Sequence, residues 1–436
     1  MNRLSIKIKY LGVLLLALLT FAACEKDFTD PGAASEAQVL STPDGVIGLA
    51  AGAQRRWSVG RQSPVYATVA GAGFTTGELR LINPGNTSEN EVALGYSDLP
   101  GSNGILTSIW EQALLTRNET DKVIANANII PNPNTRAWTI AYASIFNALA
   151  NGTMADFFQQ VTLTTESNAK FSPGTDAVKA AITTLENAKS VLTPDDGGLR
   201  SRIPAGIDIP NTVNALLARY YLYDGRYAEA ISAANAVDLS KTSVLAYDAV
   251  STNPIAFVSI LTNNVYQPID LTLGLPAALQ PAANDLRLPF YFQDITVTDN
   301  DYQAAGFFDD NLAGFPIYVP GEMALIKAEA YARQDQLPAA ITALNEVLTK
   351  QPADDAFGIG AGLPAYAGPQ TKDAVLAAIY ANRCMEMMMS GLRFGDSRRF
   401  GRPGPNDANP ERNRNWYPYP FSERDNNPET PDDPDI

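Results

Sequence analysis

Apolar residues recur at helical spacing along most of the chain. The clearest case is the segment 318–352, YVPGEMALIKAEAYARQDQLPAAITALNEVLTKQP, which predicts two helices joined by a polar turn at 334–336. Pro338 lies near the first helical position of the second helix, where a missing N–H costs nothing. Ala328 and Ala340 are small enough to let the two helices cross closely. The spacing fits a tetratricopeptide-like hairpin, which cannot bury its apolar face alone, so further hairpins are expected.

A second segment repeats these offsets. In 211–237, NTVNALLARYYLYDGRYAEAISAANAV, Ala218 and Tyr221 precede a turn at Gly225, and Ala230 and Ala234 follow it. Weaker helical patterns precede and follow the two clear hairpins. We therefore predict helical repeats over about 105–158, 175–237 and 318–400.

Two stretches lack this periodicity. Residues 71–105 are dominated by Gly, Asn, Ser and Thr, and they predict a long loop region. Residues 240–317 are interrupted by many prolines and contain short β-like pieces, one of them at 256–260. The predicted fold class is mainly α: a stack of tetratricopeptide-like helical hairpins that carries an irregular, loop-rich half with a few short strands.

The N-terminus has the features of a targeting segment. Arg3, Lys7 and Lys9 precede an apolar stretch at 11–21 that is too short to span a bilayer. Two alanines then precede Cys24, an arrangement that resembles the lipobox of bacterial lipoproteins. The pattern predicts a lipoprotein signal peptide at 1–23, a lipidated Cys24 and a tether at 24–40. An ordinary signal peptide with an incidental cysteine is the alternative.

Composition narrows the possible functions. The formal net charge is −15, which weighs against nucleic-acid binding, because that function requires a basic surface. The chain has no His, which removes the commonest general base and the commonest zinc ligand. Only two cysteines occur, so a disulfide framework is not expected. The acidic, proline-rich residues 422–436 predict a disordered tail.

A cluster of charge follows the last predicted helix. In LRFGDSRRFGR, four arginines surround Asp396, namely Arg393, Arg398, Arg399 and Arg402. We expect a salt-bridged clamp that holds this turn to the helical stack. The alternative, an anion site, has no glycine-rich phosphate loop to support it.

Several segments together resemble the SusD/RagB family of outer-membrane lipoproteins of Bacteroidota. The family segment ERRRELAFEGHRWFDLRR is similar to NRCMEMMMSGLRFGDSRR at 382–399. Upstream, VPGEMALIKAEAYAR resembles a second family helix, and the turn at 284–287 and the strip WYPYPFSERDNNP are similar to two further motifs. The resemblance covers nearly the whole mature chain, and it predicts a single SusD-like domain at 41–421. The motif residues that fall in register are Arg383, Glu386, Gly391, Arg393, Asp396, Arg398 and Arg399.

The resemblance implies a function without catalysis, cofactor or metal. Members of the family are lipid-anchored, face outward from the outer membrane, and close over a partner SusC-like TonB-dependent transporter. They catch oligosaccharides, or sometimes peptides, and deliver them to that transporter. The resemblance therefore implies that the chain is a cell-surface lipoprotein that binds a nutrient.

Candidate ligand contacts follow from sugar chemistry. Aromatic rings stack on C–H faces, and amide or guanidinium groups bond hydroxyls. The predicted loop region and the irregular half each supply such residues. The candidates are Phe74, Arg80, Asn83, Asn86, Tyr96 and Tyr266.

Two other functions stay open from the residues alone. A surface glycosidase would need paired carboxylates, and Glu78, Glu89 and Asp98 lie in the same region. A helical-repeat scaffold would bind proteins and have no small-molecule site.

Overall fold

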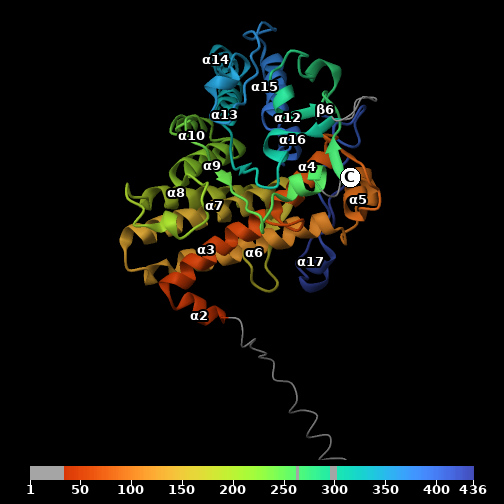
Figure 1. Ribbon diagram of the computed structural model, residues 1–436. Coiled ribbons are helices and arrows are strands. Elements are labelled where there is room, and N and C mark those ends of the chain that lie inside the picture. The colour runs from red at the N-terminus through yellow and green to blue at the C-terminus, as the bar shows by residue number, and fades with distance from the viewer. Residues whose placement is uncertain (1–33, 262–264, 295–301) are drawn as a thin grey trace, which may run out of the picture.

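The computed structural model describes residues 34–261, 265–294 and 302–436. The predicted signal peptide and Cys24 lie outside these ranges. The described chain forms a helical stack on one side and a less regular half on the other (Figure 1). This confirms the predicted fold class.

The stack is built from consecutive helices that pack in chain order. Contacts run from α6 to α7, α7 to α8, α8 to α9, α9 to α10, α10 to α13 and α13 to α14. Helices from the three predicted repeat regions thus pack side by side in one stack. Its helices are α6 (Gly104–Asn126), α7 (Pro133–Phe157), α8 (Gly174–Val191), α9 (Ile209–Tyr223), α10 (Tyr227–Asn235), α13 (Pro320–Arg333) and α14 (Leu337–Leu348).

The hairpin of α13 and α14 has a small hydrophobic core of its own. Ala328 and Ala340 are fully buried between the two helices, as their size predicted. The turn between them places Asp335 at a φ of 59°, in the left-handed region. Helix α15 (Lys372–Glu386) covers the hairpin and contributes Val375 and Ile379 to the same core.

The helices before the stack begin where capping residues occur. The side chain of Thr42 accepts a hydrogen bond from Gly45 N (3.1 Å) and starts α3 (Pro43–Ser58). The tether predicted to reach residue 40 is too long, because α2 (Glu36–Leu40) already forms there. Ser35 and Gln38 build a reciprocal capping box at its start.

The long loop predicted for 71–105 is wrong over much of its length. Ser63 caps α4 (Pro64–Thr75), which runs into this region, and α5 (Thr87–Leu94) forms within it. The glycines that suggested a loop allow close packing inside a helix. A Cβ on Gly71 would lie 3.1 Å from the ring of Phe157.

The irregular half contains short antiparallel strand pairs, as predicted. The segment 256–260 is not a strand, however, because the side chain of Asn253 caps a helical turn there. Helix α11 (Pro254–Ala256) leads into a π-helical turn at Phe257–Leu261. The strand pairs are β1 (Leu79–Leu81) with β5 (Tyr266–Pro268), β2 (Gln160–Thr162) with β3 (Phe171–Pro173), β4 (Val244–Leu245) with β8 (Phe315–Pro316), and β6 (Phe292–Asp294) with β7 (Tyr302–Ala304).

A set of buried ion pairs locks the C-terminal motif to the stack. Arg383 of α15 donates to both oxygens of Asp396 in α16 (Arg393–Arg399), at 2.8 and 3.1 Å. Arg399 lies 2.8 Å from Asp396 and donates to both oxygens of Glu329 in α13. Burial works to raise the pKa of Asp396, but Arg383 and Arg399 hold it below its usual range. The clamp therefore joins three helices.

The prediction that four arginines surround Asp396 is wrong for Arg393, Arg398 and Arg402. Arg402 pairs with Glu411 rather than with Asp396. Arg393 donates to the carbonyl oxygen of Leu273, and Arg398 donates to the carbonyl oxygens of Asp156 and Asn415. Spacing along the sequence could not separate these partners, because Leu273 and Asp156 lie 120 and 242 positions away from the arginines that bind them.

A second group of motif residues surrounds Glu386 at the end of α15. This fully buried carboxylate accepts hydrogen bonds from Arg287 (3.1 Å) and Lys350 (2.7 Å). It therefore ties the 284–287 turn and the end of the α14 hairpin to α15. Gly391, also in the motif, has a φ of 83° in the turn between α15 and α16.

The tail predicted to be disordered is ordered instead. Helix α17 (Phe421–Asn426) begins it, and Trp110 Nε1 donates to Glu423 Oε2 at 3.0 Å. Asn427 Nδ2 donates to the carbonyl oxygen of Ala169 at 2.9 Å. These partners lie far away in the sequence, so composition could not reveal them. The preceding aromatic–proline strip packs on its own chain, with Tyr417 and Tyr419 buried.

The remaining helices are short. They are α12 (Leu288–Tyr291) and single 3-10 turns at Tyr96–Asp98, Ala127–Ile129, Leu199–Ser201, Ala277–Leu279, Gly306–Phe308 and Pro352–Asp354.

Candidate functional site

The two regions expected to supply ligand contacts meet at one small sheet. Strand β1 pairs with β5 in antiparallel register, which places Arg80 opposite Gln267 and Leu81 opposite Tyr266. The pairing joins the end of α4 to the irregular half. The sequence separation of the two strands gave no indication of this contact.

The exposed side of this junction carries a hydrogen-bonded group that we call the polar edge: Arg61, Asn83, Asn86 and Glu89. Asn86 Nδ2 donates to the carbonyl oxygen of Asn83 at 3.0 Å. Arg61 Nη2 donates to Asn86 Oδ1 at 3.2 Å and also to the carboxylate of Glu89. The Arg61 side chain remains 38% exposed. The polar edge therefore presents amide and guanidinium groups that are already held in place.

Aromatic rings support the polar edge from beneath. Tyr66 Oη donates to Glu89 Oε1 at 2.6 Å. The ring of Tyr266 lies 6.0 Å from that of Tyr66 and 5.7 Å from that of Phe74, the latter edge-to-face. Burial raises the pKa of both tyrosines, so their hydroxyls stay protonated at neutral pH.

Phe74 and Tyr266 were expected to contact ligand, and that expectation is wrong. Their exposed fractions are 4% and 0%, so both rings belong to the hydrophobic core. Aromatic residues in an apparent loop can serve either role, and only packing decides which. Here α4 and β5 turn both rings inward.

Tyr96 lies at the opposite end of α5 from Asn86. Its side chain is 37% exposed, and its backbone is held by Asn413, whose carbonyl oxygen accepts from Tyr96 N at 3.3 Å. Eight helical residues separate it from Asn86, or about 12 Å along the axis at 1.5 Å per residue. A ligand that contacts both positions must be longer than one sugar ring.

Arg80 is half-buried on β1, next to the polar edge in the sheet. The sequence reasoning missed Arg61, and it considered Glu89 only as a possible catalytic acid. Arg61 and Glu89 are 28 positions apart. No local pattern links them, because their contact arises from the fold of α4 back onto α5.

The acids considered for a glycosidase do not form a catalytic pair. Glu78 is buried, and it accepts a hydrogen bond from Met389 N at 3.0 Å. Glu89 is committed to Arg61 and Tyr66, and Asp98 is exposed in the turn after α5. Each acid has different surroundings, so the structure does not assemble the paired carboxylates that glycoside hydrolysis uses.

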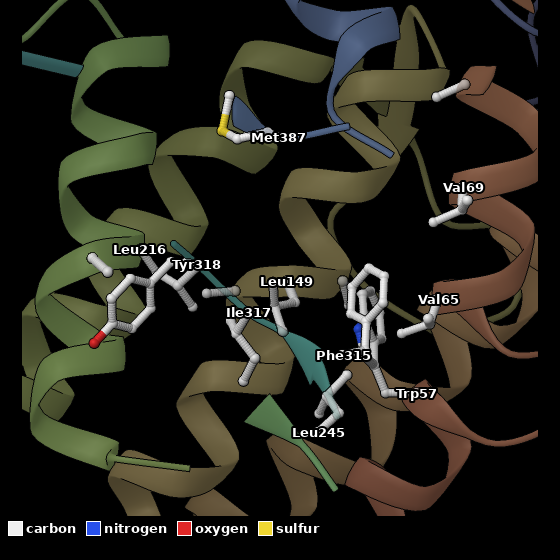
Figure 2. Packing of buried hydrophobic residues seen from close by; sticks show 14 of the residues in the cluster. Trp57, Val65, Val69, Leu149, Leu216, Leu245, Phe315, Ile317, Tyr318 and Met387 are labelled. Carbon is white, nitrogen blue, oxygen red and sulfur yellow. The ribbon is translucent and has the colours of Figure 1, made fainter. Parts of the chain in front are cut away.

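A central cavity of about 80 Å³ lies between the stack and the irregular half. Trp57, Leu149, Leu245, Phe315, Ile317 and Met387 are among the residues that line it, and Figure 2 shows the first five close to one another with Met387 above them. The volume corresponds to roughly five to eight waters at about 10–15 Å³ each. This cavity is too small for a sugar, since ligand pockets usually measure about 300–1,000 Å³.

One wall of the cavity is a buried ion pair. Arg219 donates to both oxygens of Glu322, at 2.6 and 2.7 Å, and to the carbonyl oxygen of Ile317 at 2.8 Å. The pair satisfies its own charges, which favours a structural role.

The described ranges contain neither a membrane-spanning helix nor a cluster of metal-binding side chains. None of the helices there is both long enough and apolar enough to cross a membrane. The same residues contain no group of three or more His, Cys, Asp or Glu side chains placed to hold a metal ion.

Solved structures of other proteins are similar to most of the chain. A SusD superfamily protein from Bacteroides fragilis matches with a TM-score of 0.68 at 16% identity, covering 90% of this chain and 99% of that one. A putative sugar binding protein from Bacteroides vulgatus matches with a TM-score of 0.69 at 14% identity, covering 90% and 98%. The chain has the SusD fold. A SusD-like carbohydrate binding protein from Bacteroides vulgatus also matches, with a TM-score of 0.64 at 15% identity over 81% and 83% of the two chains.

Sequence comparisons are less informative than structural ones. No protein-family profile matches the chain, and no curated protein sequence matches it either. The similarity to SusD proteins therefore lies in the backbone geometry and in the few motif residues that form the clamp. Identities of 14–16% show the fold and leave the ligand to be argued from the site.

Proposed function

We propose that this protein is a non-catalytic, cell-surface lipoprotein that binds oligosaccharide and delivers it to a partner SusC-like TonB-dependent transporter. The observation that carries the proposal is the similarity in fold to solved SusD-like carbohydrate binding proteins, which covers 81% and 90% of this chain. Lipidation of Cys24 would hold the protein at the outer membrane. The polar edge, with Arg80 and Tyr96, is the proposed glycan-contacting face.

The geometry of the polar edge suits a neutral glycan. The amides of Asn83 and Asn86 can donate to and accept from sugar hydroxyls, and the Arg61 guanidinium can donate to them. Their mutual hydrogen bonds reduce the entropy lost on binding. Tyr96 supplies an exposed ring at the other end of α5. The distance between them favours an oligosaccharide over a single sugar.

The test is glycan binding by paired variants of the full-length chain. Asn83→Ala combined with Asn86→Ala should weaken binding about tenfold, because each side-chain hydrogen bond contributes about 0.5–1.5 kcal/mol. Affinity electrophoresis against a panel of neutral polysaccharides would identify the ligand, and calorimetry would measure the loss.

Asn235→Ala is the matched control, because Asn235 is an exposed asparagine at the end of α10. Unchanged affinity in the double variant would show that the polar edge is not the site. Absence of binding to any glycan would favour the helical-repeat scaffold instead.

A further inference from the structure

A groove of about 360 Å³ lies on the stack, apart from the polar edge. It forms where the end of α7 meets the start of α8 and the side of α16. Its volume falls within the usual range of ligand pockets, about 300–1,000 Å³. The groove and the polar edge have no residue in common.

Asp156, in the last turn of α7, provides the acid of the groove. Among the described residues, its carboxylate makes no hydrogen bond and no ion pair within 4 Å. Gly395 of α16 leaves room for it, since a Cβ there would overlap Asp156 Oδ1. The carboxylate therefore rests against α16 with its acceptor capacity unused.

Arg398 balances this charge without neutralising it directly. Its guanidinium donates to the backbone carbonyl oxygens of Asp156 and Asn415. It lies between two rings, 4.2 Å from the centroid of Phe394 and 3.9 Å from that of Trp416. The cation is thus fixed in position, and the groove carries one negative and one positive charge from these two residues.

Other polar groups of the groove also have unused capacity. The hydroxyl of Tyr223 is buried and has no hydrogen-bond partner in the described structure. Thr175 and Gln159 also line the groove and are exposed. Helix α8 begins at Gly174, and its N-cap residue, Pro173, provides no side-chain cap for the first-turn N–H groups.

We propose that this groove is a second sugar site, which binds a neutral hydroxylated ring such as a hexose or pentose unit. Ring hydroxyls would donate to the Asp156 carboxylate and exchange hydrogen bonds with Thr175, Gln159 and the Tyr223 hydroxyl. The indole of Trp416 offers an apolar surface for the C–H face of the ring. Opposite charges on Asp156 and Arg398 favour a neutral ring over an acidic one. The class of ligand rests on the proposed function, whereas the site does not.

Hydrogen–deuterium exchange on the full-length chain can locate sugar at either site. The protein is kept in a detergent without a sugar headgroup, and maltotetraose, cellotetraose, xylotetraose and mannotetraose are added one at a time. At least one of them should slow exchange at 174–177, the groove segment, in the wild type. Asp156→Asn should need at least a tenfold higher sugar concentration for the same protection. Gln159→Ala should need a severalfold higher concentration.

Each outcome decides between the two sites. Protection confined to 80–96 would refute the groove as a sugar site and support the polar edge. Protection confined to 174–177 would support the groove and refute the polar edge. Wild-type behaviour of Asp156→Asn in a folded sample would also overturn the groove site. If tetragalacturonate protects 174–177 at a lower concentration than every neutral sugar does, the proposal of a neutral ligand is wrong. Asn235→Ala again serves as the control.

Discussion

Asp156 and Asp396 are both carboxylates removed from bulk water, but they face different surroundings. Asp396 accepts from Arg383 and Arg399, whose positive charges hold its pKa below the usual range. Burial raises the pKa of Asp156 to about 6, although the positive charge of Arg398 works in the opposite direction. One carboxylate stabilises the fold at neutral pH, and the other costs stability there.

Asp156→Asn should therefore stabilise the protein in a pH-dependent way. The folded pKa of Asp156 lies above the unfolded value, so the folded state binds the proton more tightly and loses stability as pH rises through about 4 to 6. One pKa unit corresponds to about 1.4 kcal/mol, and partial exposure reduces the full effect. We expect the gain in unfolding free energy to be about 1–2 kcal/mol larger at pH 8 than at pH 4.5.

Urea denaturation of the wild type and the variant at the two pH values measures this difference. Asp396→Asn is the contrasting variant, because it breaks a buried pair and should cost about 3–5 kcal/mol at pH 8. Equal effects of Asp156→Asn at both pH values would show that the Asp156 carboxylate is not destabilising.

Helix α13 packs along α15, and the two helices approach each other very closely at the start of α13. Gly321 lies in the first turn of α13, and a Cβ there would overlap Glu386 Oε1. Glu386 cannot move freely, because Arg287 and Lys350 both bond it in the core. Because residue 321 is a glycine, the Glu386 side chain can pack directly against the first turn of α13.

Gly321→Ala should destabilise the protein by about 1–3 kcal/mol, as overpacking of a filled core does. Gly48→Ala is the matched control within a helix. Gly48 is exposed in α3, and a Cβ there has no atom within 4 Å. That change should add about 0.5–1 kcal/mol, because alanine favours the helix. Thermal or urea melts of both variants provide the comparison, and a neutral Gly321→Ala would contradict the packing argument.

At the scale of the whole molecule, the proposed function depends on where the protein is held. The chain carries two cysteines, Cys24 and Cys384. Cys384 is buried in α15 and unpaired, so it cannot serve as a lipid attachment point without unfolding. The proposed anchor therefore depends on Cys24 alone.

Cys24→Ala should release the protein from the outer-membrane fraction, since acyl chains supply about 0.8 kcal/mol of membrane binding per buried CH₂. Fractionation of cells that express each variant, followed by immunoblotting, checks this. Cys384→Ala should remain in the membrane fraction. Retention of Cys24→Ala would refute the anchor and leave the glycan site untouched.

The sequence by itself determined the helical stack, because helix caps and apolar periodicity are local properties. The side chain of Thr42 caps α3, and α13 and α14 pack closely because Ala328 and Ala340 are small. Local patterns could not decide what depends on distant contacts. The short apolar run at 256–260 suited a strand or a helix equally, and Asn253 decided it.

Only the tertiary structure determined the sites. It turned Phe74 and Tyr266 inward, ordered the acidic tail against Trp110, and placed Arg61 against Asn86. The groove draws its walls from five separate helices and segments, including Asp156 and Trp416. A binding site is a convergence of side chains in space, and the fold brings them together through burial and hydrogen bonds that no single segment encodes.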